Sequence, residues 1–175
     1  LLAQTYPFEA LCLYVPKICV RQNTSYEFPD DIVQLAQADK RFQIKKIETD
    51  LGPATKIIPS MVEHYFPHAN QASPPLLISV DDDVLLEKHA IEELVLAHQS
   101  EPLSILGFMG VRDGRFFHAE HTNYANFIPV DSLGGYRSVL YPPNACASIP
   151  GIWQTLHAEH MLKLQKPVLD DDHGL

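Results

Sequence analysis

The sequence has few cysteines and no long apolar run. Its 175 residues contain three cysteines and no CxxC pair, which argues against both a disulfide framework and a structural zinc site. No apolar stretch approaches the ~18 residues that a membrane span requires. The first residues have neither the basic stretch nor the apolar run of a signal peptide. We therefore expect a protein of a reducing compartment, the cytoplasm, with no membrane span.

Basic residues are scarce, with 13 Lys and Arg against 22 Asp and Glu and a formal net charge of -9. Such a chain repels a phosphate backbone, which excludes nucleic acid as the main partner. Clustered carboxylates can bind an anion only when a cation lies between them. The excess of acidic residues therefore favours an anionic ligand that is held through a bound metal. The motifs GxSxG, GxxxxGKS and HExxH are also missing, so a serine hydrolase, a P-loop kinase and a zinc protease have no support.

Apolar runs and helical periods alternate along the first part of the chain, and short strands follow. The length suits a single domain over residues 1–175. The early alternation predicts an α/β fold with a mostly parallel sheet flanked by helices, and the later strands predict a small mixed or antiparallel part. The predicted strands are 8–15, 42–49, 76–80, 103–111, 115–118, 126–130 and 136–141, and the predicted helices are 32–38, 50–66, 85–98 and 151–165. Gly52 predicts a sharp turn, Pro59 predicts a bend or restart of the helix at 50–66, and "RDG" at 112–114 predicts a turn.

Acidic residues follow two of the predicted strands. Asp50 comes after the strand at 42–49, and Asp81, Asp82 and Asp83 follow the strand at 76–80 directly. Three adjacent carboxylates repel one another, so they are suited to a cation. Asp81 and Asp83 can converge on one side while Asp82 points away, and two oxygen ligands that leave room for water and phosphate are typical of Mg²⁺ or Mn²⁺. A solvated acidic loop that caps the next helix is the alternative interpretation.

Four segments in order resemble a known family. The strand–DDD–helix segment is preceded by "DLGPATKIIPSM" and followed by "GGYRSVLYP" and "LDDDHGL". From about residue 8 to the end, this arrangement resembles the glycosyltransferases of the GT-A fold, and most closely the family-two-like enzymes with nucleotide-sugar donors. The resemblance implies the GT-A nucleotide-diphospho-sugar transferase fold. It also implies metal-dependent, inverting transfer of a hexose from a nucleotide-diphosphate sugar to a hydroxyl acceptor, which could be a glycan, a lipid or a protein.

The resemblance assigns roles to the acidic residues. Asp81 would contact the donor ribose and the metal, and Asp83 would ligate the metal, Mn²⁺ or Mg²⁺. Asp171 and Asp172 match the acidic pair that supplies the catalytic base, with Asp172 as the base that takes the proton of the acceptor hydroxyl. His173 would be a third metal ligand. The alternative for this last motif is an acidic helix start.

The resemblance also assigns roles to residues outside the acidic motifs. Lys56 matches a basic residue near the donor diphosphate, and Asp50 would lie near the nucleobase or ribose. Gly134 and Gly135 match a glycine-bearing segment beside the sugar and acceptor, where a missing side chain permits close approach. The alternatives are a solvent-exposed helix lysine and a glycine turn before an edge strand.

The beginning of the chain departs from the family pattern. "LLAQTYPFEA" resembles the end of the helix that follows the family's first strand, so we expect that strand to be missing. A fragment of a longer protein and a minimal version both remain open. A missing strand would leave a sheet edge that invites pairing with a second copy. Two other functions also remain open: a metal-dependent phosphoesterase or nucleotidyltransferase that uses both acidic clusters, and a non-catalytic glycan-binding fragment.

Overall fold

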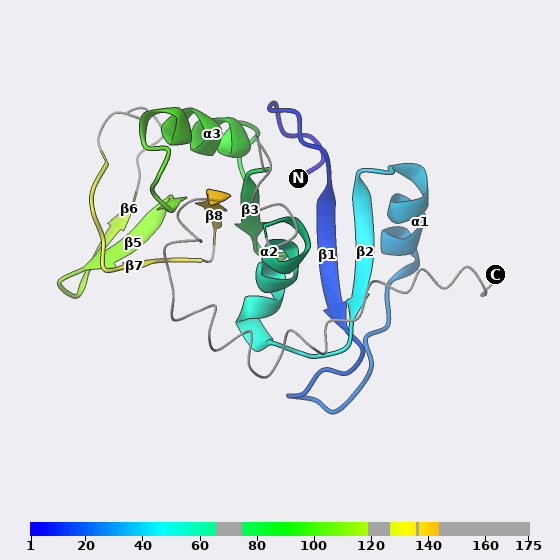
Figure 1. Ribbon diagram of the computed structural model, residues 1–175. Helices are drawn as coiled ribbons and strands as arrows, with labels where there is room; N and C mark the ends of the chain where they lie inside the picture. Colours follow the sequence, from blue (N-terminus) through cyan, green and yellow to red (C-terminus); the bar gives the residue numbers. More distant parts are fainter. Residues whose placement is uncertain (66–74, 119–126, 136, 144–175) are drawn as a thin grey trace. The chain divides into compact units, whose positions relative to one another are not determined.

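The computed structural model describes residues 1–65, 75–118, 127–135 and 137–143 (Figure 1). These residues fall into two compact units. The β1–β2 unit comprises Phe8–Pro59, and the β3–β8 unit joins Leu1–Pro7 to the described residues from Ser60 onward. A single domain over residues 1–175 stays a prediction, because compact units of this size also occur within one domain.

The β1–β2 unit is built on two parallel strands. β1 (Leu11–Pro16) pairs with β2 (Phe42–Ile47) in a register that runs from Leu11 opposite Phe42 to Pro16 opposite Ile47. The helix α1 (Asp30–Ala38) lies in the connection, as a parallel pair requires. Val15 and Phe42 are the buried apolar residues of the two strands. The strands predicted at 8–15 and 42–49 and the helix predicted at 32–38 are therefore confirmed, with shifts at their ends.

A glycine and a proline mark the next turn. Gly52 has a φ of +59°, which L side chains adopt with strain, and Pro53 occupies the first turn of the 3₁₀ helix η1 (Gly52–Lys56). A separate helix, α2 (Ile58–His64), follows and has Pro59 as its second residue. The predicted sharp turn at Gly52 and the predicted restart of the helix near Pro59 are both confirmed.

The β3–β8 unit contains a three-stranded antiparallel sheet with the order β3-β8-β4. β8 (Ser138–Tyr141) lies between β3 (Leu77–Val80) and β4 (Leu106–Gly107), and Val80 is paired with Ser138 at one end of the β3–β8 pair. Leu140 in the middle strand is fully buried. The predicted strand at 76–80 is confirmed, and the strand predicted at 136–141 is β8.

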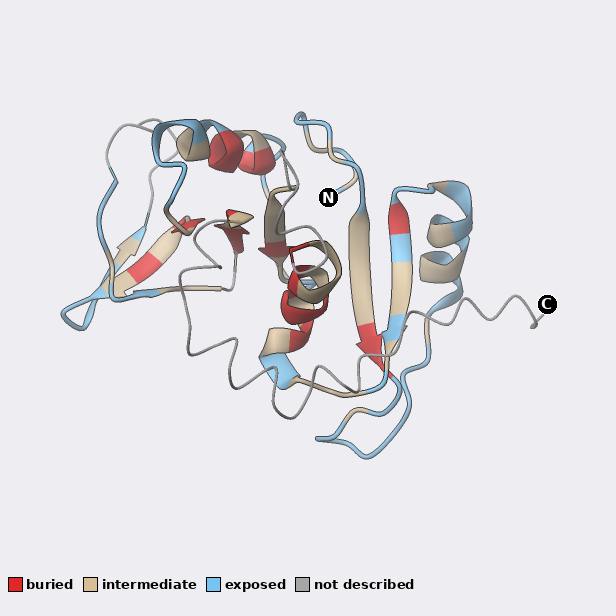
Figure 2. Ribbon diagram, viewed as in Figure 1, coloured by how far each residue is buried: buried red, intermediate tan, exposed pale blue. Residues whose placement is uncertain are grey.

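The helix α3 (Ala90–Ser100) covers the core of this unit (Figure 2). Its buried face contributes apolar residues at helical spacing, and these pack with residues from β4, β8 and the segment after β4. The buried core cluster consists of Ala90, Ile91, Leu94, Val95, Leu106, Phe108 and Leu140.

A second antiparallel sheet of the same unit has the order β6-β5-β7. β5 (Met109–Arg112) and β6 (Arg115–His118) form a hairpin, and β7 (Ser132–Leu133) pairs with the other edge of β5. Asp113 and Gly114 both have a positive φ, as the two central residues of a tight hairpin turn do. The turn predicted at "RDG" is therefore confirmed.

The predicted fold class is wrong. The sequence predicts a mostly parallel central sheet of the GT-A fold, but among the described strands β1–β2 is the one parallel pair and the four other pairs are antiparallel. The described residues form three small sheets with three α-helices, not one central sheet flanked by helices. The physical reason is the position of β8, which returns from a distant part of the sequence and enters antiparallel between β3 and β4.

Three local predictions also differ from the structure. The helix predicted at 85–98 begins at Ala90, because the side-chain amide of Gln4 and the backbone N–H of Thr5 bind the carbonyls of Glu87 and Lys88 at 2.7 and 2.9 Å. The strand predicted at 103–111 is divided into β4 and β5, which belong to different sheets. Residues 127–130 of the strand predicted at 126–130 are not in a strand. The helix predicted at 151–165 lies outside the described residues.

The membrane prediction concerns helix length and composition. Within the described ranges, no helix is both long enough and apolar enough to cross a bilayer.

Candidate functional site

The acidic triplet begins where β3 ends. Val80 is the last residue of β3, and Asp81 follows it directly with its side chain half-buried, whereas Asp82 and Asp83 are exposed. The strand fixes the start of the triplet, because Val80 is held in register against Ser138. The predicted position of these carboxylates at the end of a strand is confirmed, and their role as metal ligands stays a prediction.

The glycine segment belongs to the same unit as the triplet. β3 and β8 are antiparallel, and Val80 and Ser138 are the last pair of their register at the end where the triplet begins. Gly134 and Gly135 precede Ser138 by four and three residues, and their predicted place beside the triplet stays a prediction. Tyr136, between them and β8, lies outside the described residues.

Gly134 also has a packing role. Its N–H donates to the carbonyl of Met109 at 2.8 Å, and a Cβ atom at this position would collide with the side chain of Met109. A glycine is therefore required here by the close approach to β5, independently of any ligand.

Arg137 is a cationic residue near the end of the β3–β8 pair that sequence reasoning missed. It directly precedes Ser138, which is paired with Val80, the residue before Asp81. Its guanidinium carbon lies 5.9 Å from the centre of the Phe108 ring, and its Nη2 lies 3.8 Å from Oε1 of Glu87. The signal in the sequence was the single arginine of "GGYRSVLYP", but only the register of β8 against β3 gives it this position.

Asp50 holds a turn in the β1–β2 unit. One carboxylate oxygen accepts from the N–H of Val20 at 3.0 Å, and the other accepts from the N–H of Gly52 at 2.8 Å. These two hydrogen bonds, that from Val20 first, hold the pKa of Asp50 below its ordinary value. Asp50 therefore remains ionised and fixes the loop after β1 to the start of η1. Its predicted contact with a nucleobase or ribose stays a prediction.

Lys56 is the last residue of η1, and its side chain is half-buried. It belongs to the β1–β2 unit with Asp50, whereas the triplet and the glycine segment belong to the β3–β8 unit. Asp171, Asp172 and His173 lie outside the described residues. The predicted base and the predicted third metal ligand therefore stay predictions.

The next question is which side chains of the described residues could hold a metal ion. Among these residues, no group of three or more His, Cys, Asp or Glu side chains is arranged to hold a metal ion. A cation at Asp81 and Asp83 would take its other ligands from water, from a bound substrate or from residues beyond this part of the chain.

A cavity of about 810 Å³ lies in the β3–β8 unit. It is lined by α3, β4, β5, β6 and β7, by the segment 127–131, and by Gly135, Val139 and Tyr141. Most of the lining is apolar, and its charged side chains are the carboxylates Glu93, Glu101 and Asp131. The size is in the range of small-molecule sites, but the acidic triplet is not part of its wall.

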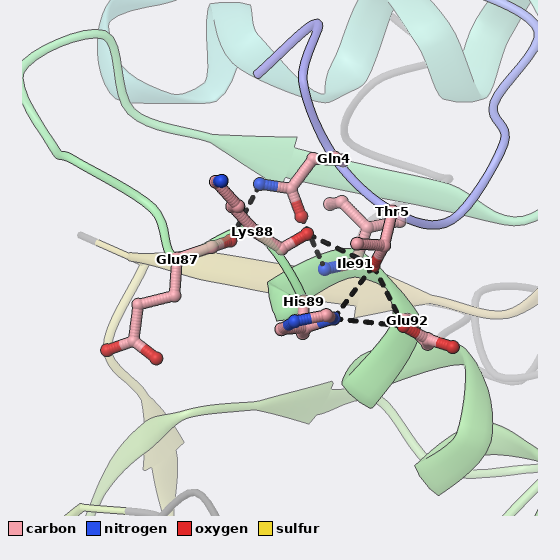
Figure 3. A network of polar contacts seen from close by, with 7 residues as sticks. All are labelled: Gln4, Thr5, Glu87, Lys88, His89, Ile91 and Glu92. Carbon is pink, nitrogen blue, oxygen red and sulfur yellow. Dashed lines mark hydrogen bonds and ion pairs between the residues drawn. The ribbon is translucent and has the colours of Figure 1, made fainter.

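A polar network connects the N-terminal segment to the start of α3 (Figure 3). The hydroxyl of Thr5 donates to Oε2 of Glu92 at 2.8 Å and lies 3.0 Å from Nδ1 of His89, which is 3.2 Å from the same carboxylate oxygen. In a catalytic triad, the histidine uses one ring nitrogen for the nucleophilic hydroxyl and the other for the carboxylate. Here Thr5 and Glu92 both contact Nδ1 of His89, so the network is not a triad. Its role is structural: it holds the N-terminal segment against the start of α3, and we call it the Thr5–His89–Glu92 clasp.

Comparison of the chain with protein-family models, with curated proteins and with solved structures gave no match. The family resemblance of the four motifs therefore stays a prediction from the sequence. The function has to rest on the residues described above.

Proposed function

We propose that this chain transfers a hexosyl group from a nucleotide-diphosphate sugar to a hydroxyl acceptor, with Mn²⁺ or Mg²⁺ at the acidic triplet. The observation that supports this function best is the convergence of two distant segments at one end of the β3–β8 pair. One segment continues from Val80 into the carboxylates from Asp81 onward, and the other brings Arg137, which directly precedes Ser138, the partner of Val80.

The donor set suits a hard divalent cation. Asp81 and Asp83 offer carboxylate oxygens on a segment that is partly open to solvent, and Mg²⁺ and Mn²⁺ bind through one or two carboxylates and keep other positions for phosphate and water. When bound there, the cation would neutralise charge that develops on the departing diphosphate.

The proposed reaction is a single displacement with inversion. The acceptor oxygen attacks the anomeric carbon, the bond from that carbon to the diphosphate oxygen breaks, and the acceptor proton moves to a carboxylate. By the sequence resemblance, that carboxylate is Asp172, with Asp171 beside it. By the same resemblance, His173 is proposed as a further metal ligand, and Lys56 and Asp50 are proposed as donor contacts.

A thermal-shift panel of nucleotide sugars, with and without Mn²⁺, tests this function. Asp83→Asn removes the proposed ligand with little change of shape, and Asp30→Asn is the matched control, because Asp30 is an exposed carboxylate at the start of α1. At about 100 times its dissociation constant, a ligand stabilises the folded state by about 2.7 kcal/mol. We expect Mn²⁺-dependent stabilisation by one donor class in the wild type and in D30N, and its loss in D83N.

Three outcomes would contradict the proposal. If no nucleotide sugar stabilises the wild type beyond Mn²⁺ alone, the chain does not bind such a donor. Equal stabilisation by simple phosphate compounds would favour a phosphoesterase or nucleotidyltransferase. Glycan binding that needs no metal and survives Asp83→Ala would favour a non-catalytic binding module.

A further inference from the structure

We infer that Gln4 and Thr5 form a releasable cap on α3, and that α3 extends by about one turn toward the acidic triplet when this cap is displaced. Both residues belong to the β3–β8 unit together with the helix. This conformational change is independent of the proposed function.

The N-terminal cap of α3 comes from outside the helix. The first N–H groups of a helix have no partner within it and need one elsewhere. His89 occupies the position that precedes α3, and its side chain does not cap the helix. Instead, the N–H of Ile91 donates to Oε1 of Gln4 at 3.1 Å, across 87 positions of the sequence. The start of α3 therefore depends on a side chain that the helix itself does not carry.

The amide of Gln4 takes the place of a helical hydrogen bond. If the helix began earlier, the N–H of Ile91 would donate to the carbonyl of Glu87, four residues before it. In the structure the Gln4 side chain bridges these two groups, because its Oε1 accepts from Ile91 and its Nε2 donates to the Glu87 carbonyl at 2.7 Å (Figure 3). One side-chain amide thus occupies both ends of the bond that would add the preceding turn.

Thr5 occupies the next helical acceptor. In a longer helix, the carbonyl of Lys88 would accept from the N–H of Glu92. Here it accepts from the backbone N–H of Thr5 at 2.9 Å, and the Thr5 hydroxyl oxygen lies 3.2 Å away. The same hydroxyl is part of the Thr5–His89–Glu92 clasp. Two consecutive carbonyls are therefore bound to the N-terminal segment at the point where α3 starts.

The residues before α3 are suited to a helix. Residues 84–89 include neither glycine nor proline, and the Leu, Glu and Lys at positions 86–88 are good helix formers. Leu86 already packs, partly buried, against the core cluster. It precedes Ala90 by four residues and Leu94 by eight, so in a longer helix all three would lie on one face. The extension is therefore compatible with the burial of Leu86.

The acidic triplet favours the longer helix. A helix N-terminus carries a partial positive charge, which interacts favourably with carboxylates close to the first turn. Six residues separate Asp83 from Ala90 in the structure. One more turn would reduce this gap to about two residues. The carboxylates would then compensate in part for the loss of the Gln4 cap.

The cap is held by contacts that solvent can reach. The hydrogen bonds from Gln4 to the Glu87 carbonyl and from the Thr5 hydroxyl to Glu92 are both exposed. Their replacement by bonds within the helix leaves the number of hydrogen bonds nearly unchanged, so the net difference in free energy is small. Two residues separate Thr5 from the first residue of the β1–β2 unit. A displacement of that unit therefore pulls on the cap through the backbone.

Nuclear magnetic resonance of the full chain tests the extension. Q4A removes the amide, Q4E keeps its size and its acceptor but not its donor, and Q4A/K88G places a glycine in the segment that would become helical. Q22A is the control, because Gln22 is an exposed glutamine of the β1–β2 unit. The ¹³Cα chemical shifts of residues 85–91 report helix formation, and hydrogen exchange reports whether the N–H of Ile91 has a partner.

We expect helical shifts at residues 86–89 in Q4A. Exchange of the Ile91 amide should stay within about tenfold of the wild type, since this N–H then donates to the carbonyl of Glu87 instead of Gln4. Q4E would show intermediate shifts, and Q4A/K88G would lose the helical shifts because glycine disfavours a helix. Q22A would match the wild type.

Two outcomes would overturn the inference. If the shifts in Q4A stay non-helical while the Ile91 amide exchanges much faster than in the wild type, Gln4 is an ordinary cap and α3 does not extend. Unchanged shifts and exchange in Q4A and Q4E would show that Gln4 does not hold the start of α3 in solution. If Q4A does not fold, Q4E decides, because a partial change toward helical shifts is expected from the extension and none from an ordinary cap.

Discussion

The hydroxyl group of Tyr65 donates a hydrogen bond to the backbone carbonyl of Tyr141, the last residue of β8. The same oxygen accepts from the N–H of Leu77, the first residue of β3, at 3.2 Å. Leu77 and Tyr141 are opposite each other in the register, so one buried phenol closes the strand pair at the end away from the acidic triplet.

Removing this hydroxyl should destabilise the protein. Tyr65→Phe leaves a backbone N–H and a carbonyl in a partly buried place without their shared partner, which costs about 1–3 kcal/mol. Urea unfolding followed by circular dichroism measures the change. Tyr6→Phe is the control, because Tyr6 is exposed and its substitution should stay within about 0.5 kcal/mol. Equal unfolding midpoints for Y65F and Y6F would contradict this role.

The core prediction concerns the middle strand of the β3-β8-β4 sheet. Leu140 is completely buried among the residues of α3 and β4, so Leu140→Ala should lower the free energy of unfolding by about 2–5 kcal/mol. Leu85→Ala removes the same atoms from a side chain that is 96% exposed, and it should change the free energy by less than about 0.5 kcal/mol. Chemical denaturation compares the two, and a similar loss in both variants would show that the core is elsewhere.

The clasp around Glu92 predicts a dependence of stability on pH. The hydrogen bond from Thr5, and next the contact with His89, hold the pKa of Glu92 below its ordinary value of 4.5. A carboxyl with a lowered pKa in the folded state stabilises the protein above its ordinary pKa, and this contribution is lost as the pH falls through the lower value. Thr5→Val removes the hydroxyl without changing the shape of the side chain.

The wild type should therefore melt at a higher temperature than T5V at neutral pH, and the difference should shrink as the pH falls below 4.5. Thr5→Ser keeps the hydroxyl and should behave as the wild type. Differential scanning calorimetry over this range measures the effect. If the difference in melting temperature between the wild type and T5V is the same at every pH, the Thr5 hydroxyl does not stabilise the ionised form of Glu92.

The turn before η1 requires a glycine for its backbone conformation. No atom lies within 4 Å of a Cβ placed on Gly52, so the cost of Gly52→Ala comes from its φ of +59° alone. We expect a loss of about 1–2 kcal/mol in urea unfolding. Gly52→Asn should cost less, because asparagine tolerates this region of φ better than alanine. If G52A and G52N unfold at the same denaturant concentration as the wild type, the turn does not hold this conformation in solution.

Local patterns in the sequence predicted the local structure well. The apolar runs that became β1, β2 and β3, the Gly–Pro turn before η1 and the hairpin at Asp113 all depend on residues within a few positions of one another. The acidic triplet was predicted at a strand end for the same reason, since an apolar run stops and three aspartates follow it.

Pairing between distant segments could not be predicted. The alternation of strands and helices favoured parallel neighbours, but nothing near residues 138–141 indicates that β8 enters antiparallel between β3 and β4. The start of α3 depends on Gln4 and Thr5, which are far away in the sequence. The position of Arg137 depends on the register of β8, so the sequence alone could not place a cation near the end of the β3–β8 pair.

The central place of β8 also has a consequence for synthesis. On the ribosome, residues 77–80 and 106–107 emerge well before residues 138–141, which are the strand that both of them pair with. Until then, apolar strands with open edges are exposed to solvent and to other nascent chains. Translation of residues 108–137 is thus an interval in which these unpaired edges favour aggregation.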